Sequence, residues 1–377
     1  MKILHNFANF SPATGGGTVT VLYQLMRGLV QRGHEITLYT SDIDHDQAYI
    51  SSLSGVKVYE FNNLLDVAGF CITPEIFAAI KRDITSFDII HLHCQRSLQH
   101  WPLVRKAKQF GVPYIIDSHG STPIMGRSMV KQLYDMTNGR YIYPRAHYIA
   151  QSDLGKQEYI NLGIDASKIS IISPLPFPVE DFQPQITPNL FRQQFVIPPN
   201  KHIILSMGRL HRIKGVDRCI AGFQKLMQYR NDVVLVIAGA DDGDMARLKK
   251  MAGDNVYFVG HIFGSVKLSA LSAASVMIQT SLYEQEAWAP FEAVLCGTPI
   301  IVSSHTGAGT DVKQLDAGYL VNIYDPNDVA DKIDYVLNHL REVRSKATKA
   351  ADYLRREATV DKVVEKYEAV YDKLHKR

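Results

Sequence analysis

The chain has few of the features that assign a sequence to a specialised class of protein. Its 377 residues hold four cysteines (Cys71, Cys94, Cys219 and Cys296) without metal-site spacing, so we expect reduced thiols in a cytosolic protein. The net charge of +3 is too small to indicate a nucleic-acid partner. The longest apolar run, residues 233–238, is far shorter than a membrane span.

We also expect that the N-terminus is not a secretion signal, because polar residues at His5, Asn6 and Asn9 interrupt its apolar run. The hydrophobic content of 46% and the charged content of 21% are typical of a soluble globular protein. A chain of this length exceeds one ordinary core, so we expect a cytoplasmic protein of two domains.

Short apolar runs alternate with helical patterns along the whole chain, which predicts two tandem parallel sheets covered by helices. The expected strands lie at residues 1–5, 35–40, 56–61, 89–93, 114–117, 202–207, 233–238, 256–260, 276–280 and 299–302. A proline-dense stretch from Ser173 to Pro199 indicates a linker, which predicts domains at 1–178 and 179–357. The last segment, about 358–377, carries an apolar stripe at helical spacing, and we expect this helix to cross back onto the first domain.

The stretch from Ser281 to Gly297 holds two glutamates at what we predict to be a helix N-terminus. Pro290 fits the first turn of this helix, so Glu292 is expected in the same turn and Glu284 in the loop before it. Backbone amides there can bind a phosphate, and the carboxylates can bind hydroxyl groups. The alternative is that a glutamate in a first turn only offsets the helix dipole.

Two cations, Arg209 and Lys214, flank glycines after the first strand of the second half. At the carboxyl edge of a parallel sheet they would suit a diphosphate leaving group, whereas a surface ion pair is the alternative. We assign the acidic pair Asp42 and Asp44 to a solvated loop rather than a metal site, because no third ligand is in view. The acidic residues at 241–244 receive the same interpretation.

In the first half, the glycine triplet Gly15–Gly17 follows a strand and opens a helix, where a phosphate could approach the backbone. A plain flexible turn is the alternative. The triplet lacks the G-x-G-x-x-G spacing and its downstream acid, which excludes a nicotinamide-dependent enzyme. His119 follows a strand end, where open α/β sheets bind ligands, although a capping histidine is an alternative. We interpret His91 and His93 as structural.

Residues 96–145 carry eight basic and two acidic residues. This face could rest on anionic lipid head groups or bind an anionic acceptor, so that a cytoplasmic protein would lie peripherally on the inner face of a membrane. A solvated helix face is the alternative.

Taken together and in order, these segments resemble the retaining GT-B glycosyltransferases of family 4, also called glycosyl transferases group 1. The matching segments are Gly15–Gly17, Gly33–His34, 88–93, 118–120, 208–215, and Glu284 with Glu292 to Pro299. The resemblance implies two Rossmann-like domains around a central cleft, the first binding the acceptor and the second a nucleotide-sugar.

The resemblance also implies residue roles. Catalytic roles would fall to His119, Arg209, Lys214 and Glu284. Substrate-binding roles would fall to Gly15, Gly16, Gly17, Gly208, Glu286, Ala287, Trp288, Ala289 and Glu292. The implied reaction transfers a sugar from a UDP- or GDP-sugar to a glycan or lipid-linked acceptor with retention, without a metal or cofactor.

Two departures from the family pattern keep a second hypothesis open. Glu286 and Ala287 stand where Phe-Gly is common, and alanine narrows the backbone conformations that glycine allows. A prolyl segment, Pro174 to Pro178, replaces the common Asn-Gly-Val-Asp. A catalytically degenerate member that serves as a nucleotide- or glycan-binding partner subunit is therefore the alternative.

Overall fold

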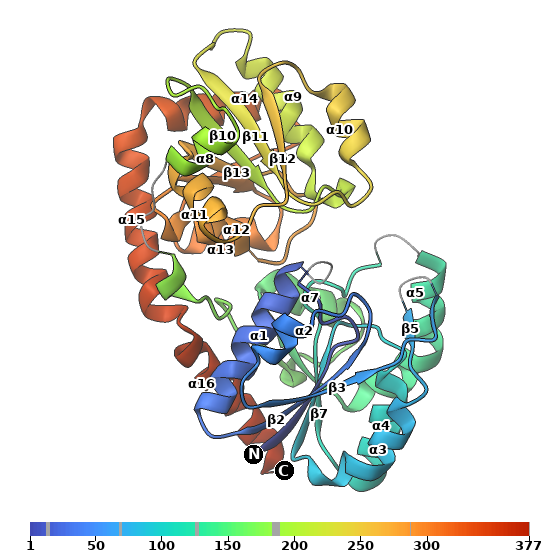
Figure 1. The fold of residues 1–377 in the computed structure, drawn as a ribbon. Helices are drawn as coiled ribbons and strands as arrows, with labels where there is room; N and C mark the ends of the chain where they lie inside the picture. The colour runs from blue at the N-terminus through green and yellow to red at the C-terminus, as the bar shows by residue number, and fades with distance from the viewer. Residues whose placement is uncertain (13–15, 68–69, 125–127, 183–188, 287, 377) are drawn as a thin grey trace. The chain divides into compact units, whose positions relative to one another are not determined.

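The chain folds into two compact units, which Figure 1 shows as ribbons. A computed structural model describes residues 1–12, 16–67, 70–124, 128–182, 189–286 and 288–376. Unit 1 comprises Met1–Phe177 and Val360–Arg377, and unit 2 comprises Pro178–Thr359. Each has a parallel sheet with helices, which confirms the predicted α/β class. Among these described residues, no helix is long and apolar enough to cross a membrane.

The main sheet of unit 1 has seven parallel strands in the order β3-β2-β1-β6-β7-β8-β9. Its strands are β1 (Lys2–Asn6), β2 (Glu35–Ser41), β3 (Val56–Phe61), β6 (Ile89–His93), β7 (Tyr114–Asp117), β8 (His147–Ala150) and β9 (Ile169–Ile171). A separate antiparallel pair is formed by β4 (Leu65–Val67) and β5 (Phe70–Ile72). The helices are α1 (Gly16–Gln31), α2 (Gln47–Ser51), α3 (Ile76–Asp83), α4 (His100–Phe110), α5 (Ser128–Tyr134), α6 (Arg140–Ile142), α7 (Asp153–Asn161) and α16 (Val360–His375), with a π-helical segment η2 (Asp135–Gly139) between α5 and α6.

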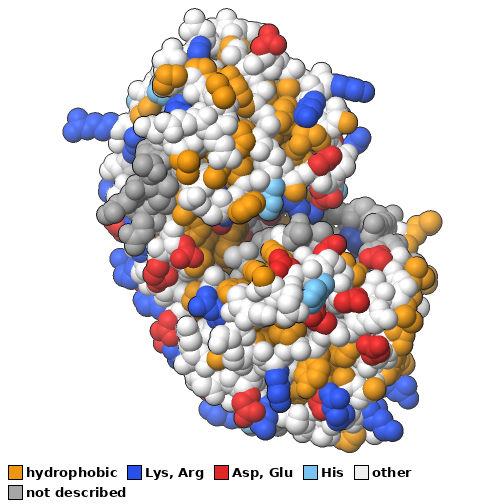
Figure 2. All heavy atoms as spheres, viewed as in Figure 1, with side chains coloured by type: hydrophobic (Ala, Val, Ile, Leu, Met, Phe, Trp, Pro, Cys, Tyr) orange, Lys and Arg blue, Asp and Glu red, His pale blue; other side chains and the backbone are white. Residues whose placement is uncertain are grey.

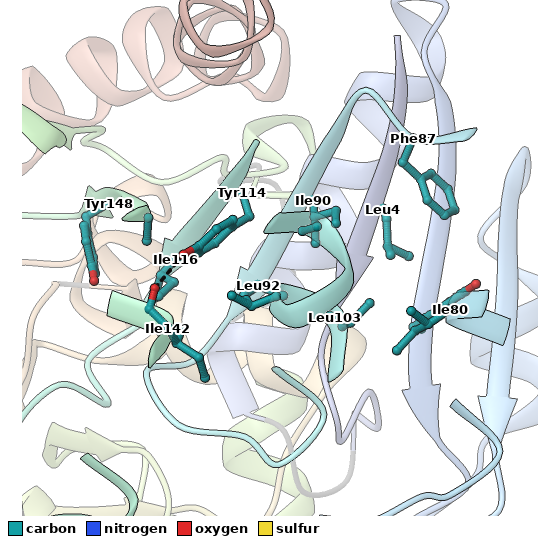
Figure 3. Close-up of a cluster of buried hydrophobic side chains, with 14 of the residues drawn as sticks. Leu4, Ile80, Phe87, Ile90, Leu92, Leu103, Tyr114, Ile116, Ile142 and Tyr148 are labelled. Carbon is teal, nitrogen blue, oxygen red and sulfur yellow. Dashed lines mark hydrogen bonds between the residues drawn. The ribbon is translucent and has the colours of Figure 1, made fainter. Parts of the chain in front are cut away.

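Apolar side chains cover both faces of the unit 1 sheet. Figure 3 shows one of these clusters, in which Leu4, Ile90 and Leu92 from the strands lie near Ile80 and Leu103 from helices α3 and α4. Buried β-branched and leucine side chains on adjacent parallel strands favour this packing, because both faces of such a sheet exclude water.

The last helix, α16, returns to unit 1 and packs beside α1, as Figure 1 shows in red and blue. Val363, Val364, Tyr367 and Tyr371 of its predicted stripe are buried in the unit 1 core. A Cβ atom at Gly28 of α1 would lie 2.6 Å from a methyl group of Val364, so glycine permits this close approach. The predicted return of the C-terminal helix is confirmed.

Unit 2 has a six-stranded parallel sheet in the order β12-β11-β10-β13-β14-β15. Its strands are β10 (His202–Met207), β11 (Val233–Ala238), β12 (Val256–Gly260), β13 (Val276–Gln279), β14 (Ile300–Ser303) and β15 (Tyr319–Val321). Its helices are α8 (Asn189–Gln194), α9 (Val216–Leu226), α10 (Met245–Met251), α11 (Gly264–Ala273), α12 (Trp288–Leu295), α13 (Gly307–Gln314), α14 (Pro326–Asn338) and α15 (Leu340–Glu357). The order reverses between β10 and β13, and open α/β sheets bind ligands beyond the carboxyl ends of strands at such a switch point.

Candidate functional site

The loops that follow β10 and β13 are joined at the carboxyl edge of the unit 2 sheet. The Leu282 amide donates to the Ile213 carbonyl at 2.8 Å, and the Thr280 hydroxyl donates to the Gly215 carbonyl at 2.8 Å. A Cβ atom at Gly215 would lie 2.1 Å from the Thr280 carbonyl oxygen, and the φ of Gly215 is +58°. Only glycine fits there without strain, so residue 215 fixes how closely the two loops approach.

This junction brings together the predicted cation Lys214 and the predicted carboxylate Glu284. Lys214 Nζ lies 2.5 Å from Glu284 Oε2, and about a fifth of each side chain is exposed, 22% and 21%. Helix α9 begins two residues after Lys214, so its unpaired N-terminal amides lie next in sequence to the cation. Lys214 also lines a small pocket together with Met207, Gly208 and Ser281.

Arg209 lies in the same loop, and its guanidinium is held by an aspartate from the loop after β11. Its Nη1 atom is 2.5 Å from Asp242 Oδ2, and half of the Arg209 side chain is exposed. Gly208 has a φ of +155°. A Cβ atom at Gly239 would lie only 1.8 Å from the Gly208 carbonyl oxygen. Glycines at both positions therefore let the loops after β10 and β11 meet.

The acidic residues at 241–244 have structural partners. Asp241 Oδ1 accepts hydrogen bonds from the amides of Gly243, Asp244 and Met245, and the Asp244 carboxylate receives two hydrogen bonds from Arg247. In unit 1, Asp42 similarly accepts from the Asn63 amide. These contacts agree with the interpretation of both segments as loops.

The prediction that Glu292 occupies the first turn of its helix is wrong. Helix α12 begins at Trp288, so Pro290 is its third residue and Glu292 its fifth. Proline is tolerated at any of the first four positions of a helix, because their N–H groups have no intrahelical partner. Pro290 therefore indicates that a helix begins nearby, but it does not identify the first residue of that helix. Glu292 is 3% exposed.

The Glu292 carboxylate is held by two donors within unit 2. Lys267 Nζ of α11 lies 2.6 Å from Glu292 Oε1, and the indole Nε1 of Trp288 donates to the same oxygen at 3.0 Å. A buried carboxylate requires such partners, because its desolvation would otherwise favour the neutral form. Trp288 and Glu292 can form this hydrogen bond because residues four apart in a helix lie on the same face.

The other predicted binding residues lie at or just before the starts of helices α12 and α1. Glu286 and Ala289 are partly buried, whereas Ala287 lies outside the described residues. In unit 1, Gly15 also lies outside them, Gly16 begins α1 with a φ of +59°, and open space surrounds the Cβ position of Gly17.

His119 lies at the carboxyl end of β7 in unit 1, with its imidazole turned inward. Its Nε2 atom is 2.9 Å from His93 Nδ1, and its Nδ1 atom is 3.5 Å from Asp117 Oδ1. The side chain is 4% exposed, although the whole residue is only partly buried, so solvent reaches mainly its backbone. The φ of +45° is unusual for a residue with a side chain and is held by these two contacts.

The hydrogen bond from His119 to His93 belongs to a longer buried network. The strand register sets His5 opposite His91, and His93 opposite Asp117. His93 Nε2 lies 2.9 Å from His5 Nδ1, while His91 Nδ1 lies 2.8 Å from the Tyr371 hydroxyl of α16. Both predicted structural histidines, His91 and His93, are buried.

Burial keeps these imidazoles neutral. It lowers the pKa of His5 to about 3 and holds the pKa of His91 and His93 well below the usual range. Burial also raises the pKa of Asp117, an effect that His119 partly counteracts. Neutral imidazoles can bind metals, and the described residues contain two groups of suitable atoms, His5 with His91 and His93, and His93 with Asp117 and His119. His93 stacks on His5 in the first group and on His119 in the second, and it is hydrogen-bonded to both, which favours a hydrogen-bonded network. His91 is tilted against His93 and bonds to Tyr371 instead.

Sequence reasoning missed Lys267, Asp242 and His5. Lys267 and Glu292 lie 25 residues apart on different helices, and no spacing rule connects them. His5 could have been placed beside the His-x-His of residues 91–93 only if the strand order had been known, because β1 and β6 are neighbours although four strands separate them in sequence.

Comparison with known proteins matches nearly the whole chain. The family model described as Glycosyltransferase Family 4 matches residues 15–174, and the model described as Glycosyl transferases group 1 matches residues 189–353. An uncharacterized glycosyltransferase of Methanocaldococcus jannaschii is 26% identical over 363 residues, covering 90% of this chain and 89% of that protein. A D-inositol 3-phosphate glycosyltransferase of Thermobifida fusca is 23% identical over 410 residues, with coverage of 99% and 92%.

Solved structures share the fold at lower identity. The crystal structure of Anabaena Alr3699/HepE in complex with UDP-glucose has a TM-score of 0.79 and 18% identity, covering 99% of this chain and 100% of that one. The two family models, the relatives and the GT-B architecture agree with one another. The chain therefore belongs to glycosyltransferase family 4, the glycosyl transferases group 1, and is an enzyme of the transferase class.

Proposed function

We propose that this enzyme transfers a sugar from a UDP- or GDP-sugar to a hydroxyl group of a glycan or lipid-linked acceptor, with retention and without a metal. The observation that carries the proposal is the contact between Lys214 and Glu284 at the carboxyl edge of the unit 2 sheet. A cation and a carboxylate in contact there can separate to bind a phosphate and sugar hydroxyls, respectively.

In this proposal Lys214 and Arg209 stabilise the diphosphate. Negative charge grows on the diphosphate as its bond to the sugar breaks, so fixed cations act more strongly on the transition state than on the bound donor. Both cations are paired with carboxylates, Lys214 with Glu284 and Arg209 with Asp242. Donor binding would exchange these partners, and the N-terminal amides of α9 would add hydrogen-bond donors.

Glu284 would bind hydroxyl groups of the donor sugar, and Glu292 would bind the ribose. Lys267 and Trp288 hold the Glu292 carboxylate in place, which supports a fixed acceptor of hydrogen bonds rather than a mobile one. Gly208, Glu286, Ala287 and Ala289 would line the donor site in this proposal.

Unit 1 is proposed to bind the acceptor, with Gly15, Gly16 and Gly17 near the phosphates and His119 near the donor sugar. Because the His119 imidazole is bonded to His93, a contact through the ring would require that hydrogen bond to break. The exposed backbone of His119 can make a contact without that cost.

The proposed chemistry needs no protein nucleophile. The acceptor oxygen would attack the anomeric carbon from the face that the diphosphate leaves, the bond from carbon to phosphate oxygen would break, and that oxygen would take the acceptor's proton. Arg209 and Lys214 would supply the positive charge that a metal ion supplies in other transferases. A lipid-linked acceptor would suit an enzyme whose basic 96–145 face contacts an anionic membrane.

The UDP-glucose complex of the Anabaena relative makes UDP-sugars the first donors to test. We would incubate the protein with UDP-, GDP- and ADP-sugars in the presence of a chelator and measure the release of each nucleoside diphosphate. A thermal-shift panel with the same compounds reports binding independently, since a bound ligand raises the midpoint of unfolding. Binding without release, with every acceptor tried, would favour the degenerate partner-subunit alternative.

A further inference from the structure

The Asp117 carboxylate at the end of β7 receives hydrogen bonds from three separate parts of unit 1. Its Oδ2 atom accepts a hydrogen bond from the Tyr367 hydroxyl of α16 at 3.1 Å. Its Oδ1 atom accepts one from the side-chain amide of Gln151, which directly follows β8, and one from the His119 amide at 3.4 Å. Asp117 is fully buried, and a buried carboxylate requires such donors. The carboxylate therefore links the C-terminal helix to the turn that carries His119.

The Tyr367 hydroxyl departs from the amphipathic pattern of its helix. The outer face of α16 carries exposed charged side chains of both signs, which are Asp361, Lys362, Glu365, Lys366, Asp372 and Lys373. Figure 2 shows red and blue side chains on the lower left of unit 1, where Figure 1 draws α16. The inner face is apolar, and Tyr367 is fully buried in the same core cluster as Val363 and Val364. A phenylalanine would fill the same space, so core packing explains the ring of Tyr367 but not its hydroxyl group.

His119 depends on the Asp117 carboxylate because its backbone has a left-handed conformation. The φ of +45° is one that residues with a side chain rarely adopt. Asp117 Oδ1 lies 3.5 Å from the His119 Nδ1 atom and also accepts from the His119 amide, so one carboxylate holds both the ring and the backbone. A carboxylate that lost the Tyr367 hydroxyl could rotate, and the partly exposed backbone of His119 would then move with it.

A second tyrosine holds the same turn from the other face of the sheet. The Tyr159 hydroxyl of α7 accepts a hydrogen bond from the Ser118 amide at 3.0 Å. Tyr159 and Tyr367 belong to different core clusters, which cover the two faces of the unit 1 sheet. The turn is therefore fixed from both faces, and the Tyr367 hydroxyl is the contribution of the C-terminal helix.

We propose that Tyr367 is a positioning residue for sugar transfer, because its hydroxyl fixes the Asp117 carboxylate and, through it, His119. The inference rests on the proposed function, in which His119 lies near the donor sugar. A displacement of about 1 Å at a reacting group can reduce a rate about a hundredfold. Loss of one buried hydroxyl group should displace His119 by less, so we expect kcat to fall roughly tenfold in Tyr367→Phe.

Tyr371→Phe is the matched control. Tyr371 lies one turn later in α16, is also fully buried, and its hydroxyl is bonded to His91 Nδ1 at 2.8 Å. His91 Nε2 is 4.0 Å from Asp117 Oδ2, which is too far for a hydrogen bond. Each variant loses one buried hydrogen bond and keeps its ring, so both should destabilise unit 1 to a similar extent in urea unfolding. Only Tyr367→Phe should lower kcat.

The first measurement follows His119 directly and needs no activity. In full-length protein whose histidines alone carry isotopic nitrogen, the His119 amide signal in a nuclear magnetic resonance spectrum is identified by its loss in His119→Ala. We expect this signal to shift in Tyr367→Phe and to keep its position in Tyr371→Phe. A folded Tyr367→Phe variant whose His119 signal does not move would overturn the proposal.

The second measurement is a double-mutant cycle on kcat, with the donor found by nucleotide release. His119→Ala removes the imidazole and both of its contacts, so little remains for Tyr367 to position. Tyr367→Phe should therefore lower kcat roughly tenfold in the wild-type background and less than about twofold in the His119→Ala background. Binding of the nucleoside diphosphate, which is proposed to occur in unit 2, should be unchanged in Tyr367→Phe.

The outcomes separate this inference from the proposed function. Equal losses of kcat in the two backgrounds, or a Tyr367→Phe variant as active as Tyr371→Phe, would overturn the positioning role and leave the donor site untouched. If His119→Ala kept full activity, the role of His119 in the proposed function would fail, and the positioning role would fail with it. If the wild type released no nucleotide from any donor, both would fail, although the histidine signal would still show whether Tyr367 holds His119.

Discussion

Acidification should destabilise unit 1 more than unit 2, because only unit 1 buries histidines among the described residues. Burial lowers the pKa of His5 and of His100 to about 3, whereas histidine in an unfolded chain titrates near 6.5. Between these two values the unfolded state binds more protons than the folded state. Stability is therefore complete above about pH 6.5 and is lost as the pH falls toward 3.

The size of the effect follows from proton linkage. At pH 5.5 each fully buried histidine contributes about 1.4 kcal/mol to the destabilisation, so His5 and His100 together contribute about 3 kcal/mol. His91 and His93 act in the same direction. For a domain whose total stability is about 5–15 kcal/mol, this loss is large.

The two tryptophans allow each unit to be followed separately. Trp101 lies on α4 of unit 1 and Trp288 on α12 of unit 2, and the chain has no others. We would measure urea unfolding by fluorescence at pH 7.5 and 5.5 in Trp288→Phe, which reports unit 1, and in Trp101→Phe, which reports unit 2. The unit 1 midpoint should fall markedly at the lower pH, and the unit 2 midpoint should change little.

Two substitutions make the reasoning refutable. His100→Leu removes a fully buried imidazole, so it should reduce the pH dependence of unit 1 by about one proton. His305→Asn, at an exposed unit 2 position, should leave both transitions unchanged. An unchanged unit 1 midpoint at pH 5.5, or an equal fall in unit 2, would contradict the assignment of the effect to buried histidines.

Three further predictions concern single side chains. Glu292→Gln should reduce kcat/KM for the donor at least tenfold while keeping the hydrogen bond from Trp288; near-normal kcat/KM would exclude the ribose role. Asp242→Asn should free Arg209 and tighten binding of a nucleoside diphosphate by a few-fold in calorimetry, since an exposed ion pair contributes only about 0.2–1 kcal/mol; weaker binding would show that Asp242 positions Arg209 instead. Gly28→Val should destabilise unit 1 by about 1–3 kcal/mol in urea unfolding, because its side chain would collide with Val364 of α16, and an unchanged midpoint would mean that the helix can shift.

Much of the fold followed from periodicity in the sequence. Apolar runs such as 233–238 and 202–207 are strands because both faces of a parallel sheet exclude water, and the stripe on α16 had to be buried somewhere. The sequence pattern did not reveal β8, β9 and β15, or the pair β4 and β5. Each has only three or four residues, and so short an apolar run cannot be told from part of a buried helix.

The candidate site was predicted only in part. Lys214 and Glu284 were predicted to share one edge because each follows the carboxyl end of a parallel strand and glycines flank the cation, and the structure brings them into contact. The partners of the other predicted residues were not foreseen. Lys267 reaches Glu292 from another helix, and Asp242 reaches Arg209 from another loop, through tertiary contacts that leave no periodic trace in the sequence.

The central proposal is that Lys214, released from Glu284, stabilises the departing diphosphate, and steady-state kinetics of Lys214→Ala test it most directly. With the donor identified by the nucleotide-release panel, kcat should fall by about a hundredfold while KM changes little. This result is expected because the variant loses a cation that stabilises the negative charge of the transition state. A variant that keeps its kcat, or one that changes KM alone, would contradict this role for Lys214.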